Sequence, residues 1–87
     1  DQEHAVELLA TLYAQGLGTP KDDTLATKLF QRAAENGYSG AMVALYARLR
    51  EGTGAAKNES VADDWLRKAA ALGDEKALAI MKQRGLR

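Results

Sequence analysis

The chain contains an internal repeat with a period of 36 residues. The segment GLGTPKDD at residues 16–23 recurs as GTGAAKNE at residues 52–59, and the same offset aligns residues 5–40 with residues 41–76. Nine of those 36 aligned positions are identical, most of them alanine or glycine. Repeats of this length are typical of proteins built from stacked units, each of which buries its apolar face only against its neighbours. The repeat therefore favours a stack of units over a single globular core.

Between the glycine-rich segments, the apolar residues follow helical spacing. They recur every three or four positions in residues 5–16, 26–37 and 62–73. No stretch shows the sustained alternation of a half-buried strand, and Pro20 is the only proline. The pattern predicts helices over residues 3–15, 23–36, 39–51, 59–72 and 75–84.

The glycine-rich segments also suggest a phosphate-binding loop. Such a loop occurs once and follows a strand, whereas this segment recurs with the period of the helices. We therefore interpret it as a turn between helices, in which Asp22 and Asn58 cap the helix that follows and glycines adopt left-handed backbone. The predicted loop and cap residues are Gly16, Gly18, Asp22, Gly37, Gly52, Gly54, Asn58 and Gly73.

The two repeats share a pattern of small, apolar and glycine residues, with two departures: Tyr46 stands at the position of Ala10, and Leu49 at that of Tyr13. In the first repeat these are Ala5, Leu9, Ala10, Tyr13, Gly16, Gly18, Asp22, Ala26, Leu29, Phe30, Ala33, Ala34 and Gly37. In the second they are Ala41, Leu45, Gly52, Gly54, Asn58, Ala62, Trp65, Leu66, Ala69, Ala70 and Gly73. The pattern resembles the Sel-one-like repeat (SLR) family, which is related to the tetratricopeptide repeats.

The resemblance implies an all-α fold, a right-handed α-solenoid of antiparallel helix pairs with two 36-residue repeats and a closing half-repeat helix. We expect a single domain over residues 1–87, with repeats at 5–40 and 41–76 and a terminal helix at 77–87. Because the chain starts without a methionine, we also expect it to be a fragment of a longer protein.

Proteins of this family are mostly adaptors that present a concave surface to other proteins, and many bacterial members act in secretion or host interaction. The resemblance therefore implies a protein–protein interaction scaffold that is not an enzyme and uses no cofactor. An alternative is a structural spacer of a larger bacterial protein that self-associates through its exposed end faces. A further alternative is a hydrolase of the cysteine-rich subgroup, but this chain has no cysteine and lacks the framework of that subgroup.

Composition limits the remaining function classes. The 12 basic residues are balanced by 12 acidic ones, so nothing indicates nucleic acid as a partner. No apolar run approaches the roughly 20 residues of a membrane span, so we expect no membrane insertion. The only histidine is His4, and no residues have the spacing of metal ligands or of a nucleophile with its base, so we expect neither a metal site nor a catalytic one. Without cysteine, the compartment stays open between cytoplasm and periplasm.

The first helices of successive repeats are expected to line the concave side of the solenoid. If Ala5, Leu9 and Leu12 face the core, helical geometry places Ala10 on the opposite, exposed side of the first helix. The repeat offset then places Tyr46 on the same exposed side of the third helix.

Tyr46 and Arg50 lie one turn apart on that expected side, and Lys82 has the repeat position of Tyr46. Tyrosine and arginine are enriched at binding hot spots because each combines apolar area with polar groups. We expect a groove that binds an acidic segment of a protein or peptide, while a competing interpretation packs Tyr46 inward between repeats. The predicted groove residues are Glu7, Thr11, Val43, Tyr46, Ala47, Arg50 and Lys82.

Overall fold

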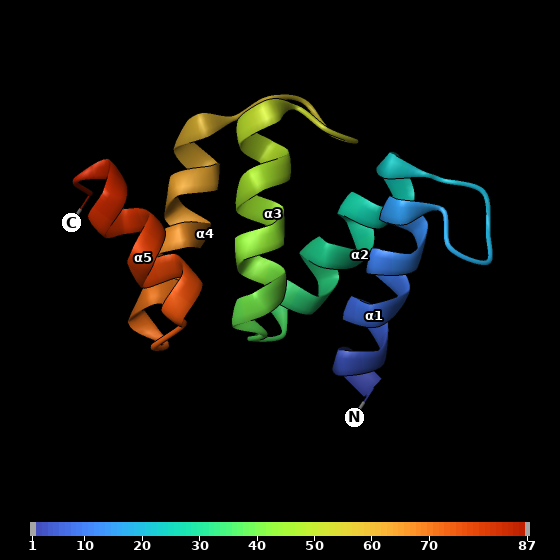
Figure 1. Ribbon diagram of the computed structural model, residues 1–87, viewed down its shortest axis with the longest axis horizontal. Coiled ribbons are helices and arrows are strands. Elements are labelled where there is room, and N and C mark those ends of the chain that lie inside the picture. The colour runs from blue at the N-terminus through green and yellow to red at the C-terminus, as the bar shows by residue number, and fades with distance from the viewer. Residues whose placement is uncertain (1, 87) are drawn as a thin grey trace.

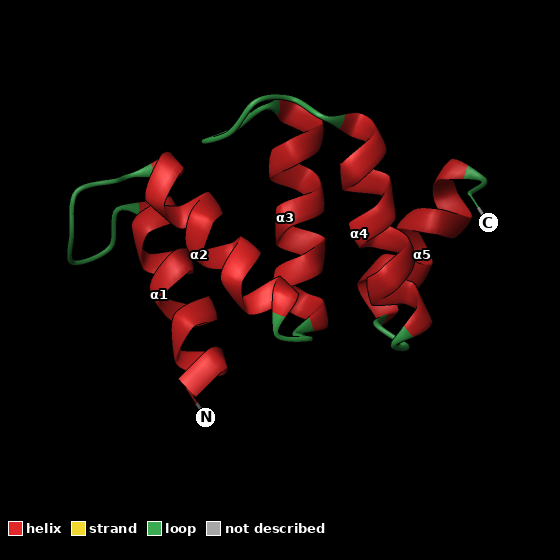
Figure 2. Ribbon diagram, turned by 180° about the vertical axis from the view of Figure 1, so that it is seen from behind, coloured by secondary structure: helices red, strands yellow, loops and turns green. Residues whose placement is uncertain are grey.

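The computed structural model describes residues 2–86, and every regular element in that range is a helix (Figures 1 and 2). The helices are α1 (Gln2–Gln15), α2 (Asp23–Glu35), α3 (Ser39–Glu51), α4 (Glu59–Ala71) and α5 (Glu75–Arg84). The five predicted helices are confirmed, with their ends in place to within one residue.

The helices stack in chain order along the longest dimension of the molecule. Each helix packs against the one before it and the one after it, with α1 at one end and α5 at the other (Figure 1). The long glycine-rich loops, which join α1 to α2 and α3 to α4, lie along one edge (Figure 1). The tight turns that join α2 to α3 and α4 to α5 lie along the opposite edge (Figure 1). The stack measures 38 × 28 × 18 Å and is an all-helical solenoid.

Alanine makes up most of the interior. The fully buried alanines lie where two helices meet, because a methyl side chain lets helix backbones approach closely. Among the paired alanines of α2 and α4, Ala33, Ala34 and Ala69 are buried and Ala70 is half-buried. The larger buried side chains are Phe30, Met42, Leu45, Tyr46 and Leu66.

Local sequence signals set the ends of the helices. Asp22 Oδ1 accepts a hydrogen bond from the Leu25 N–H at 3.0 Å, and Asn58 Oδ1 accepts one from the Val61 N–H at 3.1 Å. Both predicted caps are therefore confirmed. The six predicted glycines all have positive φ angles, as left-handed turn residues do.

The side of α1 that we expected in the core is exposed. Leu9 and Leu12 are 42% and 41% exposed, Ala5 is exposed as well, and Ala10 is completely buried. That prediction assumed one buried side, but a first helix has two. The side that carries Ala10 packs on the second helix of the same repeat. The side that carries Leu9 has the same repeat position as the side of α3 that packs on α2. On α3 this side is covered, and Leu45 is fully buried. On α1, no helix within residues 2–86 covers it.

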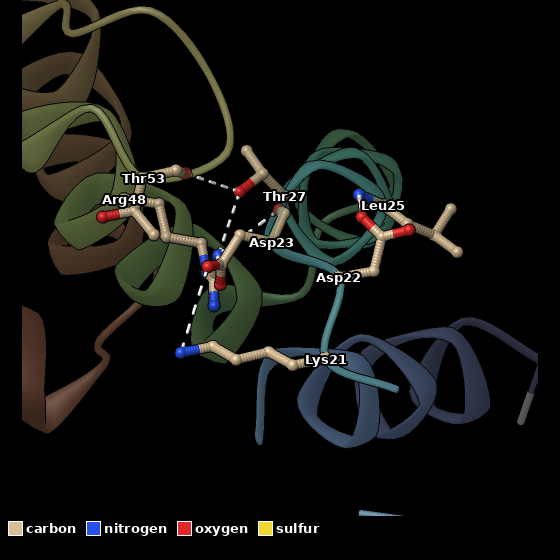
Figure 3. A network of polar contacts seen from close by, with 7 residues as sticks. All are labelled: Lys21, Asp22, Asp23, Leu25, Thr27, Arg48 and Thr53. Carbon is tan, nitrogen blue, oxygen red and sulfur yellow. Dashed lines mark hydrogen bonds and ion pairs between the residues drawn. The ribbon is translucent and has the colours of Figure 1, made fainter. Parts of the chain in front are cut away.

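A polar network joins α2 to α3 (Figure 3). Arg48 Nη1 of α3 donates hydrogen bonds to Asp23 Oδ1 at 3.3 Å and to Thr27 Oγ1 at 3.2 Å. The guanidinium of Arg48 also lies over the ring of Phe30, 5.5 Å from its centroid. The Thr27 hydroxyl donates to the carbonyl oxygen of Thr53 at 2.9 Å, which ties the α3–α4 loop to α2. The hydroxyl of Thr27, a residue only 2% exposed, therefore has both a donor and an acceptor partner.

The α3–α4 loop approaches α2 so closely that only glycine fits at residue 54. A Cβ atom on Gly54 would clash with the carbonyl oxygen of Asp23 and lie 2.6 Å from Thr27 Oγ1. Gly18 has the same repeat position and the same φ of +73°, but a Cβ atom there would have no neighbour within 4 Å.

We expect Gly18→Ala to lower the free energy of unfolding by about 1 kcal/mol, the cost of left-handed backbone for alanine. Gly54→Ala should cost about 1 to 3 kcal/mol more, because the clash adds to the same strain. Urea denaturation of both variants measures the difference. Equal losses would contradict the close approach of the loop to α2.

Candidate protein-interaction surface

The exposed side of α3 carries a stripe of residues spaced three or four positions apart. Gly40, Ala47 and Arg50 are exposed and Val43 is half-buried. We call these four residues the α3 stripe. Val43, Ala47 and Arg50 belong to the predicted groove, so the sequence placed these three residues on an accessible side of α3.

Tyr46 lies in the core, and the expectation of an exposed aromatic anchor is wrong. Tyr46 is only 5% exposed and belongs to the buried cluster, as Ala10 does at the same position of the first repeat. The competing interpretation, in which the ring packs inward, describes the structure. The physical reason is again that a first helix packs on two sides.

The hydroxyl of Tyr46 joins two guanidinium groups. Tyr46 Oη accepts a hydrogen bond from Arg50 Nη1 at 2.7 Å and another from Arg84 Nη1 at 3.0 Å. The two guanidinium carbons lie 6.0 Å (Arg50) and 5.7 Å (Arg84) from the centroid of the tyrosine ring. Arg84 Nη1 also donates to Asp63 Oδ1 at 2.8 Å. We call Tyr46, Arg50, Asp63 and Arg84 the tyrosine–arginine cluster; it brings together α3, α4 and α5.

Asp63 and Arg84 stabilise each other's charge. The hydrogen bond from Arg84 lowers the pKa of Asp63 below its usual value; the charges of Arg84, Arg67 and Arg50 lower it further, while partial burial opposes them. The same hydrogen bond to Asp63 raises the pKa of Arg84. Arg50 and Arg84 both lie in the last turn of their helices, where the helix dipole favours a positive charge.

Sequence reasoning missed Arg84 and Asp63. The signal was present, because Arg84 lies one period after Arg48, and Asp63 lies one period after Thr27. Arg48 donates to Thr27 at the first junction, and Arg84 donates to Asp63 at the second. The repeat offset would have predicted the second contact only once the first was known from the structure.

The other predicted groove residues are placed apart from the cluster. Lys82 is exposed on α5, and within residues 2–86 no hydrogen bond, ion pair or ring contact joins it to the cluster. Glu7 is half-buried, and its Oε2 would lie 3.2 Å from a Cβ atom on Gly40 in the first turn of α3. The Glu7 carboxylate therefore complements the positive end of the α3 dipole. Thr11 donates a hydrogen bond from its hydroxyl to the carbonyl oxygen of Glu7, at 3.1 Å within α1.

The part of the chain that the structure describes contains no group of three potential metal ligands and no pocket. The ring of His4 lies beside that of Tyr38, with 6.3 Å between their centroids. None of the described helices has the length and apolar character needed to cross a membrane.

The helix pairs, the glycine loops and the buried alanines recur in a known family. The family model described as Sel1 repeat matches residues 1–38 and 41–74. This chain belongs to the Sel1 repeat family. The resemblance inferred from the sequence is therefore confirmed. Sel1 repeats are generally non-catalytic scaffolds that mediate protein–protein interactions.

Three solved structures illustrate the similarity. A Sel1 repeat protein from Oxalobacter formigenes is 37% identical with a TM-score of 0.90, over 93% of this chain and 61% of that one. Cysteine rich protein B of Helicobacter pylori is 27% identical with a TM-score of 0.85, over 90% of this chain and 59% of that one. A protective antigen of uropathogenic Escherichia coli with an SLR fold is 30% identical with a TM-score of 0.85, over 97% of this chain and 19% of that one.

This Sel1 repeat chain thus spans about three fifths of two of these proteins and about one fifth of the third. No sequence among the curated proteins matches it significantly.

The ion pair between Asp63 and Arg84 should make the free energy of unfolding depend on pH. Because the folded pKa of Asp63 is lowered, its contribution is fully present above the unfolded pKa and is lost as the pH falls through the folded value. Asp63→Asn should therefore lower the free energy of unfolding at pH 7, by up to about 1 kcal/mol for a pair at the surface. The difference from the unmodified chain should shrink below about pH 4.

Asp64→Asn is the matched control. The side chain of Asp64 is 73% exposed, and its contact with Arg67 is 3.6 Å long, so its loss should change stability little. Urea denaturation between pH 3 and pH 7 gives both comparisons. If Asp63→Asn lowers the free energy of unfolding by the same amount at every pH, the stabilising ion pair between Asp63 and Arg84 is contradicted.

Proposed function

We propose that this chain is a protein-interaction module that binds an acidic segment of a partner protein along the α3 stripe. The proposal is supported mainly by Arg50. Arg50 is an exposed residue whose Nη1 is hydrogen-bonded to Tyr46, and no carboxylate of the described residues forms a salt bridge with it. An exposed positive charge that no carboxylate contacts directly attracts a negatively charged partner.

The surroundings of Arg50 suit contact with a peptide. Val43 and Ala47 precede it along the stripe and offer apolar area with small side chains, against which another backbone can lie closely. Arg50 itself is held by its 2.7 Å hydrogen bond to a buried tyrosine, so less side-chain freedom is lost on binding. The scaffold role that is general for Sel1 repeats is consistent with this use.

Self-association is a second candidate, and one observation favours it. Leu8, Leu9 and Leu12 are 54%, 42% and 41% exposed on the side of α1 that no described helix covers. A contiguous apolar surface of this kind often marks a contact site. Sedimentation equilibrium over a range of protein concentrations separates the candidates. Only self-association predicts that the apparent molecular mass rises with concentration. The Leu9→Gln variant should then keep the mass of the monomer.

Peptide display against the immobilised chain tests the acidic-segment proposal. We expect the enriched peptides to be rich in Asp and Glu. Arg50→Glu should weaken their binding by at least about tenfold, as loss of a hot-spot arginine does. Lys28→Glu is the matched control, since it makes the same change of charge on an exposed position of α2. Enriched peptides without acidic residues, or equal binding to both variants, would contradict the proposal.

A further inference from the structure

The side of α1 that no described helix covers is apolar. Its exposed residues, which we call the α1 patch, are Ala5, Leu8, Leu9 and Leu12. The acidic and basic side chains described in this helix turn toward α3 instead. The ring of His4 lies beside that of Tyr38, at the start of α3. The Glu7 carboxylate lies against Gly40, in the first turn of α3.

Leu12 decides what kind of helix can cover the α1 patch. It has the repeat position of Arg48 and Arg84, each of which pairs with an aspartate of the preceding second helix. A helix like α2 or α4 would bring its aspartate to Leu12, where no arginine balances the charge. The α1 patch therefore suits a helix that is uncharged along its contact side.

Of the two ends of the stack, only α1 offers such a side to a second copy of the chain. The free side of α5 carries Lys82, which is exposed and has the repeat position of the buried Ala10 and Tyr46. Contact between α1 and α5 would take this ammonium group out of water, which costs free energy. Contact between the α1 patches of two copies has no such cost.

We propose that two copies of the chain form a symmetric dimer through an antiparallel contact between their α1 patches. The inference rests on the second candidate of the proposed function, self-association, and assigns its geometry. The α1 patch is centred between Leu8 and Leu9. A two-fold axis at that point places Ala5 of one copy against Leu12 of the other.

The sizes of the facing side chains favour the antiparallel arrangement. A small residue then meets a large one, and alanine lets the two helices approach closely, as it does inside the stack. A parallel contact would set Ala5 against its own copy and leave a gap there, with a loss of packing contacts.

Sedimentation equilibrium of the intact chain tests whether the α1 patch joins two copies. Each copy contributes one helix, so the contact falls below about 1,200 Å², and we expect a dissociation constant that is micromolar or weaker. Leu12→Arg introduces the residue that α3 and α5 have at this position. It should raise the dissociation constant at least about tenfold, because it brings a charge into the contact.

Leu78→Arg is the matched control. Leu78 is 49% exposed at the other end of the stack, so the same change of charge there should leave the dissociation constant unaltered. Because both leucines are exposed, both variants should stay folded, which thermal melts check.

Disulfide formation between introduced cysteines tests the antiparallel geometry. The chain contains no cysteine, so each substitution adds its only thiol. Residues 5 and 12 are about 10 Å apart along a helix, so in an antiparallel dimer of one variant the two thiols lie beyond the reach of a disulfide. A mixture of Ala5→Cys and Leu12→Cys chains should therefore cross-link at least about tenfold faster than either variant alone. Lys28→Cys, exposed on α2, replaces Leu12→Cys in the control mixture and gives the rate of random collision.

The inference is overturned if the chain stays monomeric at every concentration, which leaves the α1 patch to a different partner. It is also overturned if Leu78→Arg weakens the dimer as much as Leu12→Arg does, as a contact between α1 and α5 requires. Cross-linking of Ala5→Cys or Leu12→Cys alone, as fast as in the mixture, would show a parallel dimer and would retain self-association without this geometry. The acidic-segment proposal stands or fails separately, because peptide display measures binding at the α3 stripe.

Discussion

The packing of α2 against α3 is the interaction on which the rest of the structure depends. Each helix pair is too small to bury much apolar surface alone, so the stack is stable only where one pair covers the next. At this junction Leu45 is fully buried, and Arg48 reaches across to α2 while its guanidinium lies on Phe30. The close approach of Gly54 to α2 adds the loop to the same contact. The junction thereby sets the orientation of α3, and with it the α3 stripe.

The tyrosine–arginine cluster is a variant of the same junction, one period later. Arg84 occupies the repeat position of Arg48, and each donates to the preceding second helix. The second junction differs because Tyr46 replaces the small Ala10 and brings a hydroxyl to Arg84 and Arg50. The contact that joins the repeats thus also holds the exposed side chain of Arg50.

Much of the fold followed from the sequence because its signals are local. Helical periodicity, the capping side chains of Asp22 and Asn58, and the turn glycines each act within a few residues, and all were predicted correctly. The buried side of α1 was not predicted correctly. Whether Leu9 or Ala10 is buried depends on which helices lie beside α1, and the spacing of apolar residues does not show this. Tyr46 was misplaced for the same reason. Arg84 was missed although its repeat position matched Arg48, since a long side chain reaches a helix that periodicity alone does not identify.

One comparison tests most directly whether the α2–α3 junction holds the stack together. Leu45 and Leu9 share a repeat position, but Leu45 is fully buried at the junction and Leu9 is 42% exposed on α1. Urea denaturation should show that Leu45→Ala lowers the free energy of unfolding by about 2 to 5 kcal/mol, as a buried leucine does. The same measurement on Leu9→Ala should show a loss of about 1 kcal/mol or less. Equal losses for the two variants would contradict the central role of the junction.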